Sequence, residues 1–468
     1  MSKQLLRVGN SSPVPHINRS NAFWVGLFFF TAVVWGVMIY FTLVPWLMGT
    51  TLPVNSTIDI SILTWAFVIL SLVSSALWFV MQAGFLIVGN RMTQYQKKLI
   101  SQVTYTVSRP LVSIVIPARN EEVVIRRTIS SALAQSYTNI EVLVICHNCT
   151  DNTFLVASKF ADKRVRAFDL RTEQAGKGIA LDYAAENSLG KYLLVLDSDG
   201  ILKEDFIDTA LPLFDRPNVA AVQGKLLSSN RNYNLITKLL ALEGDLFSIP
   251  FMTIKSLFDR RTPLGGTGYI VRRDILQTVG GFGNALIDDF ELSFRLFRNK
   301  FRIQFAPLSI EYDEKPPELP LMLRQRSRWV KGHLDLLTHR VAETTDIVGN
   351  IYWLNPVLMI AGLSAMCIVS FGLLHYLLFG DIPYKFSFIP IKIWIVMTLA
   401  GYLLQLAVLM KQDGRKGLRK AGILALMPAF SVYWYVVLIK SFFVKSWAST
   451  KTTHGFHHDK EIALLKNS

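Results

Sequence analysis

Long stretches without a charged side chain constrain the fold of this chain more than any other feature. No charged residue occurs in residues 20–58 or in a second run over residues 60–90. Residues 23–48 alone exceed the roughly 20 apolar residues that span a bilayer, and they are longer than a signal-peptide core. A pair of buried core helices is the alternative, but such long uncharged runs are rare in soluble cores. We therefore predict a transmembrane hairpin over residues 23–90.

Basic residues flank this hairpin on both sides. Residues 1–22 contain Lys3, Arg7 and Arg19 and no acid, and Arg91 and Lys97 follow the second run. Because basic segments beside a membrane span stay on the cytoplasmic side, both ends of the hairpin are expected there. Residues 1–22 are then a cytoplasmic N-terminal segment.

Apolar sequence returns in a C-terminal transmembrane region predicted over residues 351–446. Residues 351–380, 393–410 and 421–439 are uncharged, and a basic loop separates the last two stretches. Three full crossings would place the tail, residues 447–468, outside. The tail is basic, however, which favours the cytoplasm. Because Pro428 and Lys440 interrupt and end the third stretch, we expect that stretch to be re-entrant or interfacial.

The middle of the chain, residues 91–350, has a different pattern. Short β-branched runs at residues 111–116, 140–145, 165–170 and 192–196 alternate with helical patterns at residues 123–134, 152–160 and 178–186. We expect Pro117 to end the first strand. This order predicts an α/β domain with a mostly parallel sheet flanked by helices. Ligands of such sheets bind at the carboxyl ends of the strands.

Composition narrows the class of protein further. The chain has 51% hydrophobic and 18% charged residues, against about 25% charged in a typical soluble domain. Disordered, collagen-like and disulfide-stapled proteins are excluded, and three cysteines make no disulfide framework. The net charge of +15 is compatible with nucleic acid, anionic lipid or phosphate-rich substrates.

Two pairs of acids are candidates for chemistry. Asp197 and Asp199 directly follow a predicted strand, where two carboxylates can share Mg²⁺ or Mn²⁺. An ordinary turn is the alternative for this segment. Asp288 and Asp289 precede a helical pattern over residues 290–298, and there the alternative is helix capping or a favourable dipole interaction.

Three further segments carry unusual residues. A Gly-rich loop over residues 265–268 lets backbone approach a ligand, although it lacks the spacing of a P-loop or a Rossmann fingerprint. The run Arg-Gln-Arg-Ser-Arg-Trp at residues 324–329 is either a membrane-surface helix or a phosphate clamp, since Arg suits bidentate phosphate contacts. Cys146 and Cys149 suggest zinc or redox chemistry, but zinc needs about four ligands, and we expect only the loop after the second strand.

Taken together, these segments resemble the membrane-integrated family-2 glycosyltransferases, the group of the hyaluronan, chitin, cellulose and poly-N-acetylglucosamine synthases. The resemblance covers residues 111–332 and the flanking helices. The matching segments, in the order of the family, are Val112–Pro117 with residues 118–122, residues 176–178, Asp197-Ser198-Asp199, Val222-Gln223, residues 265–268, Asp288-Asp289 and Gln325-x-x-Arg328-Trp329.

The resemblance implies a GT-A-like catalytic domain between transmembrane helices, with interfacial helices, that uses a nucleotide sugar with inversion. It implies that Asp289 is the catalytic base and that Asp197 and Asp199 bind Mg²⁺ or Mn²⁺. The residues implied to bind the nucleotide sugar are Pro117, Arg119, Glu121, His147, Lys177, Asp197, Ser198, Gln325, Arg328 and Trp329.

One segment departs from the family pattern, and a second segment extends the resemblance to the tail. His147 or Cys146 stands where the family commonly has an Asp that contacts the base, so the resemblance implies UDP less firmly than it implies the sugar transfer. The tail resembles the Trp…Lys-Thr-x-His-Gly tail of many bacterial members. By that resemblance Lys451 and His454 are candidates for a cytoplasmic gate over the nucleotide, and an ordinary solvated tail is the alternative.

The resemblance implies an integral, multi-pass protein of a bacterial cell membrane with a cytoplasmic catalytic domain. We expect it to elongate a polysaccharide. Single transfer to a lipid or lipid-linked acceptor is the alternative, and a non-catalytic membrane scaffold is an alternative of another class. The expected partners are a nucleotide-sugar donor, a glycan or lipid-linked acceptor and membrane lipids. Nucleic acid is not required, because phosphates, the membrane surface and cytoplasmic loops account for the positive charge.

Overall fold

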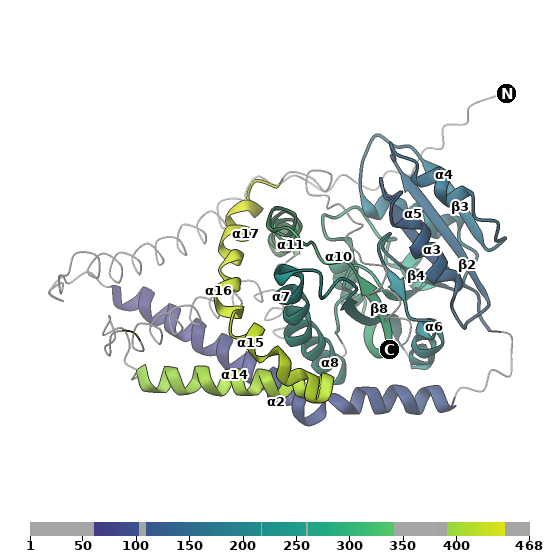
Figure 1. Cartoon of the computed structure of the whole chain (residues 1–468). Coiled ribbons are helices and arrows are strands. Elements are labelled where there is room, and N and C mark those ends of the chain that lie inside the picture. The colour runs from purple at the N-terminus through teal and green to yellow at the C-terminus, as the bar shows by residue number, and fades with distance from the viewer. Residues whose placement is uncertain are drawn as a thin grey trace.

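The computed structural model describes residues 60–102, 109–216, 218–258, 261–340, 378 and 391–444 (Figure 1). The predicted N-terminal segment, the first apolar run, most of residues 341–390 and the tail with Lys451 and His454 lie outside these residues. The predictions for them therefore stay predictions.

The described residues form one mixed sheet of eight strands in the order β3-β2-β1-β4-β7-β6-β8-β5. Strands β3, β2, β1 and β4 are mutually parallel, β7 is antiparallel to β4 and to β6, and β5 is antiparallel to β8. The strands are β1 (Val112–Ala118), β2 (Ile140–His147), β3 (Val165–Leu170), β4 (Tyr192–Val195), β5 (Ile201–Leu202), β6 (Val219–Ser228), β7 (Tyr269–Arg272) and β8 (Arg302–Asp313).

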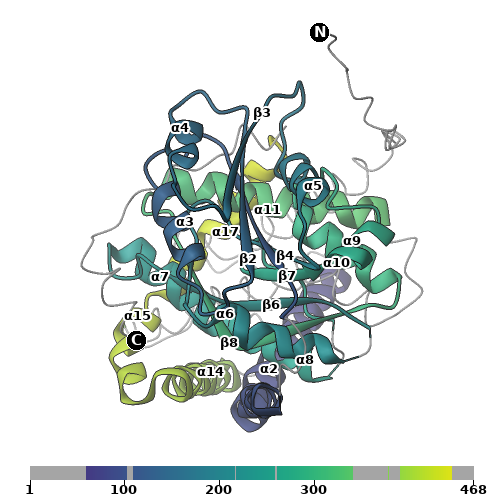
Figure 2. The same cartoon turned by 90° about the vertical axis from the view of Figure 1, so that its right-hand side faces the viewer.

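Helices cover both faces of the sheet. Successive residues of a strand point to opposite faces, and here both faces carry apolar side chains that the helices bury. Ile114 of β1 belongs to a core with α3 (Ile125–Leu133) and α6 (Phe206–Ala210). Val115 belongs to the core of the other face, with α5 (Lys177–Asn187), α9 (Arg273–Thr278) and α10 (Asp288–Arg298). Figure 2 shows α3 and α6 on one side of the sheet and α5, α9 and α10 on the other.

The strands and helices predicted over residues 111–196 are confirmed, with ends that agree within two residues. The prediction that Pro117 ends the first strand is wrong, since β1 continues to Ala118 and Pro117 pairs with Ile145. Val115 accepts a hydrogen bond from the backbone of Leu196, so its backbone polar groups face β4. The backbone polar groups of Pro117, two residues further on, point to the same side of β1 as those of Val115. The pairing of β1 with β4 ends at Val115, so Pro117 has no partner strand on that side. The N–H that proline lacks therefore removes no hydrogen bond from the sheet.

A second group of helices packs beside the eight-stranded sheet. Figure 1 shows the long helix α2 alongside α14, below α8. Leu239, Leu246 and Ile249 pack with Phe85 of α2 and Val408 of α14 in one apolar cluster. These helices are α2 (Ile60–Gln102), α7 (Leu235–Glu243), α8 (Ile249–Phe258), α11 (Leu319–Arg340), α14 (Ile391–Asp413), α15 (Ala421–Leu424), α16 (Met427–Ser431) and α17 (Tyr433–Ser441). The 3₁₀ helix η4 (Gly414–Lys420) and the π-helix η2 (Gly244–Ser248) complete this group. The short helix α4 (Thr153–Ser158) and the 3₁₀ helix η1 (Leu211–Asp215) instead pack in the core of the sheet, with α3 and α6.

Within the described residues, no single helix has both the length and the apolar composition needed to cross a bilayer. One bent pair, Leu399–Leu424 and Met427–Ser441, meets the requirement together, with 62° between its two parts. The bend lies just before Pro428, inside the stretch for which we expect an interrupted span.

Candidate active site

One cavity of about 500 Å³ opens at the carboxyl ends of the parallel strands. It is lined by every predicted site residue that lies in the described part of the chain: Pro117, Arg119, Glu121, His147, Lys177, Asp197, Ser198, Asp199, Asp289, Gln325, Arg328 and Trp329. The structure therefore brings together side chains from segments up to about 200 residues apart, and their individual roles stay predictions.

The two acids that follow β4 sit in different surroundings. Asp197 has a side chain that is 36% exposed, and its Oδ1 lies 2.5 Å from Nζ of Lys177. Asp199 is buried, and its Oδ2 accepts a 3.1 Å hydrogen bond from the backbone N–H of Glu314. Two carboxylates in one cavity suit Mg²⁺ or Mn²⁺, which takes its remaining ligands from phosphate and water. The residues therefore fit the implied ion.

Lys177, the first residue of α5, connects this pair with the Gly-rich loop. Its Nζ donates a 2.6 Å hydrogen bond to the carbonyl oxygen of Gly266. Burial lowers the pKa of Lys177, but the nearby carboxylates of Asp197 and Asp288 outweigh burial and raise it overall. Lys177 thus stays charged at the centre of an acidic cavity.

Asp288 and Asp289 are the first two residues of α10. The capping interpretation is not supported, since the N-cap position is Ile287 and no side chain caps the helix. Burial, then the neighbouring Asp288, raises the pKa of Asp289 to about 7. Asp289 also approaches the Gly-rich loop: a Cβ on Gly266, whose φ is +86°, would lie 3.7 Å from its Oδ2.

The basic run at residues 324–329 lies on helix α11, which directs some of its arginines to solvent and others into the protein. Arg324 is exposed, whereas Arg326 and Arg328 turn inward and line the cavity. Arg328 donates a 3.3 Å hydrogen bond to the carbonyl oxygen of Leu286. Burial lowers the pKa of Arg328, and the carboxylates of Asp288 and Asp289 oppose that effect. The inward pair does not match a membrane-surface helix.

Sequence reasoning missed the partners of Arg326. Its Nη1 donates a 2.8 Å hydrogen bond to Glu243 of α7, and Tyr433 of α17 donates another of 2.8 Å to the same carboxylate. The guanidinium lies 4.6 Å from the ring centroid of Trp329 and 5.2 Å from that of Trp434. Arg326 therefore connects α7, α11 and α17 while its guanidinium lies over the Trp329 ring. These partners are far away in the chain, so the sequence has no local signal for them.

His147, which lines the cavity at the end of β2, is held by two neighbours. Its Nδ1 lies 3.1 Å from the carbonyl oxygen of Gly176 and its Nε2 lies 2.7 Å from Oγ1 of Thr172. Burial lowers the pKa of His147, which favours the neutral ring at pH 7. A hydrogen-bonded neutral His can orient this loop but does not supply the charge of an Asp.

Cys146 and Cys149 are free and buried. Our expectation that the whole segment is a loop is wrong for Cys146 and His147, which end β2, and holds for Cys149. Cys149 accepts a hydrogen bond from the backbone of Asn120 at 3.4 Å and so supports the neighbouring cavity wall. Among the described residues, no group of three or more His, Cys, Asp or Glu side chains is placed to hold a metal ion.

Comparison with known proteins agrees with this geometry. Residues 109–332 match the family "Glycosyltransferase like family 2". The probable glycosyltransferase YdaM of Bacillus subtilis is 26% identical over 72% of this chain and 83% of its own length. A beta-monoglucosyldiacylglycerol synthase of Nostoc is 31% identical over 53% of this chain and 52% of its own.

A poly-beta-1,6-N-acetyl-D-glucosamine synthase of Staphylococcus aureus is 24% identical over 48% of this chain and 55% of its own. The chain thus spans about half the length of the two synthases. The mixed sheet with flanking helices is GT-A-like, and it carries the predicted motifs into one cavity. Residues 109–332 are therefore a glycosyltransferase family 2 domain, and the chain is an enzyme of the glycosyltransferase class.

Proposed function

We propose that this chain is a membrane-embedded, inverting glycosyltransferase that moves a sugar from a nucleotide sugar, first of all a UDP-sugar, to a growing polysaccharide. The observation that carries the proposal is the position of Asp289. A half-buried carboxyl with a pKa of about 7 shares one cavity with Asp197, Asp199 and Arg328. The cavity therefore offers a proton acceptor and a diphosphate site together.

The leaving group needs positive charge, because the diphosphate oxygen becomes negative as the sugar bond breaks. Asp197 and Asp199 would hold Mg²⁺ or Mn²⁺, which supplies such charge when bound. Arg328 offers a planar guanidinium suited to phosphate. Lys177 adds a second fixed cation, 2.5 Å from Asp197.

The attacking hydroxyl must lose its proton. We assign that proton to Asp289, because a base works best when its pKa lies near the working pH. Attack from the face opposite the leaving diphosphate inverts the anomeric carbon. Trp329 lines the same cavity and offers a flat apolar surface for the acceptor ring.

Exposed apolar side chains support contact with a bilayer. On α2, Val80 and Ile87 are exposed, and so are Leu399 and Leu403 of α14. Large apolar side chains repeated along two neighbouring helices are unfavourable in water and suited to lipid. The bent pair that ends at Ser441 adds a further candidate membrane segment.

The acceptor has two candidates. The Gln325-x-x-Arg328-Trp329 motif and the similarity to a poly-N-acetylglucosamine synthase support polysaccharide elongation. The cavity wall from α7 and α8 supports a lipid acceptor, because Leu240, Ile249 and Met252 line it. The similarity to the glucosyldiacylglycerol synthase supports the same alternative.

Product length separates the two. The purified full-length chain in lipid nanodiscs is supplied with Mn²⁺ and a panel of UDP- and GDP-sugars, with diacylglycerol or a short oligosaccharide as acceptor. A ladder of products that grows with time supports elongation, whereas a single glycolipid supports the alternative. No transfer and no nucleotide-sugar hydrolysis from any donor would contradict the proposed activity, with the Asp289→Asn variant as the inactive control.

A further inference from the structure

A buried acid, Glu311, lies beneath the turn formed by Asp197, Ser198 and Asp199. The proposed reaction gives this acid no role. Glu311, near the end of β8, is fully buried and pairs with Leu202 of β5 and Leu226 of β6. Burial is the main influence that raises the pKa of Glu311, and the carboxylates of Asp313 and Asp197 add to it. A carboxyl buried in this way lowers the free energy of unfolding unless hydrogen bonds compensate for its lost hydration.

Those contacts join two loops of the cavity. The backbone N–H of Asp197 donates a 2.9 Å hydrogen bond to Oγ1 of Thr267. Oγ1 of Thr267 in turn donates a 3.0 Å hydrogen bond to Oε1 of Glu311. The chain of hydrogen bonds therefore runs from the Asp-Ser-Asp turn, through the Gly-rich loop, to a strand in the core.

Two glycines make room for this carboxyl. A Cβ on Gly200 would lie 2.5 Å from Oε1 of Glu311, and a Cβ on Gly268 would lie 2.7 Å from Oε2. Gly268 also has a φ of +60°, which glycine adopts without strain. Each glycine belongs to one of the two loops, so the carboxyl is enclosed by the segments that it connects.

We propose that Glu311 is a positioning residue that fixes the Asp-Ser-Asp turn against the Gly-rich loop. Through Thr267 it sets where Asp197 and Asp199 face a divalent cation and the donor diphosphate. This inference rests on the cation and nucleotide use of the proposed function. Glu311 lies beneath the turn and acts only through Thr267, so it is not a catalytic residue.

Four variants test the chain of hydrogen bonds. Glu311→Ala and Thr267→Val each remove one connection, whereas Glu311→Gln and Thr267→Ser keep an acceptor and a hydroxyl at the same places. We measure Mn²⁺-dependent binding of the nucleoside diphosphate by calorimetry, together with kcat and KM. Glu311→Ala and Thr267→Val are expected to weaken Mn²⁺-dependent binding and to lower kcat about 10- to 100-fold. Glu311→Gln and Thr267→Ser are expected to retain most of both.

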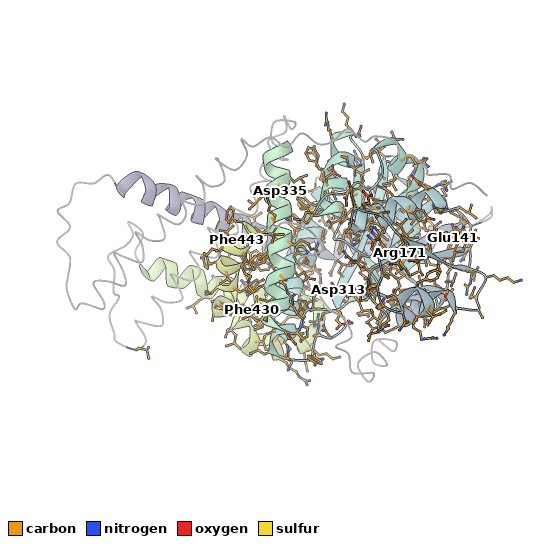
Figure 3. All side chains as sticks on the ribbon, turned by 90° about the horizontal axis from the view of Figure 1, so that it is seen from above. Glu141, Arg171, Asp313, Asp335, Phe430 and Phe443 are labelled. Atoms are coloured by element: carbon orange, nitrogen blue, oxygen red, sulfur yellow. The ribbon has the colours of Figure 1, made fainter. Side chains whose placement is uncertain are left out.

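The chain supplies a matched control. Ser113 of β1 donates a 2.6 Å hydrogen bond to the buried Glu141 of β2, the same kind of pair at the opposite end of the strands. Figure 3 shows Glu141 far across the domain from Asp313, the close neighbour of Glu311 in β8. Ser113→Ala is expected to lower the melting temperature without changing Mn²⁺-dependent binding.

Three outcomes overturn the inference. The first is normal Mn²⁺-dependent binding and kcat in folded Glu311→Ala and Thr267→Val. The second is a loss in Ser113→Ala equal to that in Thr267→Val. The third is a Glu311→Gln variant as impaired as Glu311→Ala. A wild type that binds nucleotide with Mn²⁺ but transfers no sugar contradicts the proposed function alone, because the binding series still tests Glu311.

Discussion

Lys177 and Asp197 form a 2.5 Å ion pair across the centre of the cavity, between the first turn of α5 and the end of β4. The same ammonium group donates a hydrogen bond to the carbonyl of Gly266 and acts on Asp289 through space. One cation therefore influences the proposed metal site and the proposed base together.

Removing this cation should move the pH dependence of the reaction. Asp289 must be ionised to accept a proton, so kcat/KM should fall as pH drops through its pKa of about 7. The charge of Lys177 lowers the pKa of Asp289. In Lys177→Met the acid limb should therefore shift to higher pH, and in Lys177→Arg it should remain near that of the wild type. A profile for Lys177→Met that overlays the wild type would contradict this coupling.

Substitution of the proposed base should separate turnover from binding. Asp289→Asn keeps the shape of the side chain but cannot accept the proton, so kcat should fall about 10²- to 10⁴-fold. Nucleotide affinity should change little, and Asp288→Asn should have a milder effect on kcat. Equal losses of binding and turnover in Asp289→Asn would identify a structural acid instead.

The same variant should be more stable than the wild type above pH 7. The folded-state pKa of Asp289 is raised to about 7 from an ordinary value of 3.8. From pH 4 to pH 7 the unfolded chain has released this proton while the folded chain retains it, so stability falls as pH rises. Asp289→Asn lacks this loss. Melting temperatures of both proteins at pH 5 and pH 8 should therefore diverge at the higher pH.

The metal assignment depends on Asp199. Asp199→Asn leaves an oxygen that can accept the N–H of Glu314, so the fold should survive while a charged ligand is lost. We expect most of the activity and the Mn²⁺-dependent part of nucleotide binding to disappear. EDTA should inactivate the wild type, and added Mn²⁺ or Mg²⁺ should restore it. Activity that is indifferent to EDTA would remove the metal from the proposal.

Substitutions of the two inward arginines of α11, Arg326 and Arg328, should have different effects on activity and on stability. Arg328→Lys keeps the charge but loses the planar fork, so kcat/KM should drop clearly while the melting temperature is retained. Arg326→Met breaks an ion pair with Glu243 whose two side chains are only 11% and 13% exposed, and it should lower the free energy of unfolding by about 3 kcal/mol. Thermal unfolding and steady-state kinetics on both variants distinguish these outcomes. Similar profiles for the two would favour a single role for the basic run.

Much of the first half of the domain could be predicted from local patterns. The apolar runs of β1, β2, β3 and β4 can be recognised without knowing any distant partner, and so can the helical patterns between them. The spacing of apolar residues that distinguishes a strand from a helix is visible within a short stretch of sequence. The position of Asp197 at a strand end followed from the same pattern. The sequence does not predict the effect of Pro117, because that effect depends on which neighbouring strand its missing N–H faces, and only the sheet order decides that.

The sequence by itself thus determined the alternation of strands and helices, the acids at strand and helix ends, and the family to which their order points. The tertiary structure alone decided which polar side chains meet inside the domain. Thr267 and Glu311 are 44 residues apart, and Glu243 and Arg326 are 83 residues apart. Their hydrogen bonds depend on how β8 and α11 pack against segments far away in the chain. Local propensity extends over only a few residues, so it carries no information about such partners.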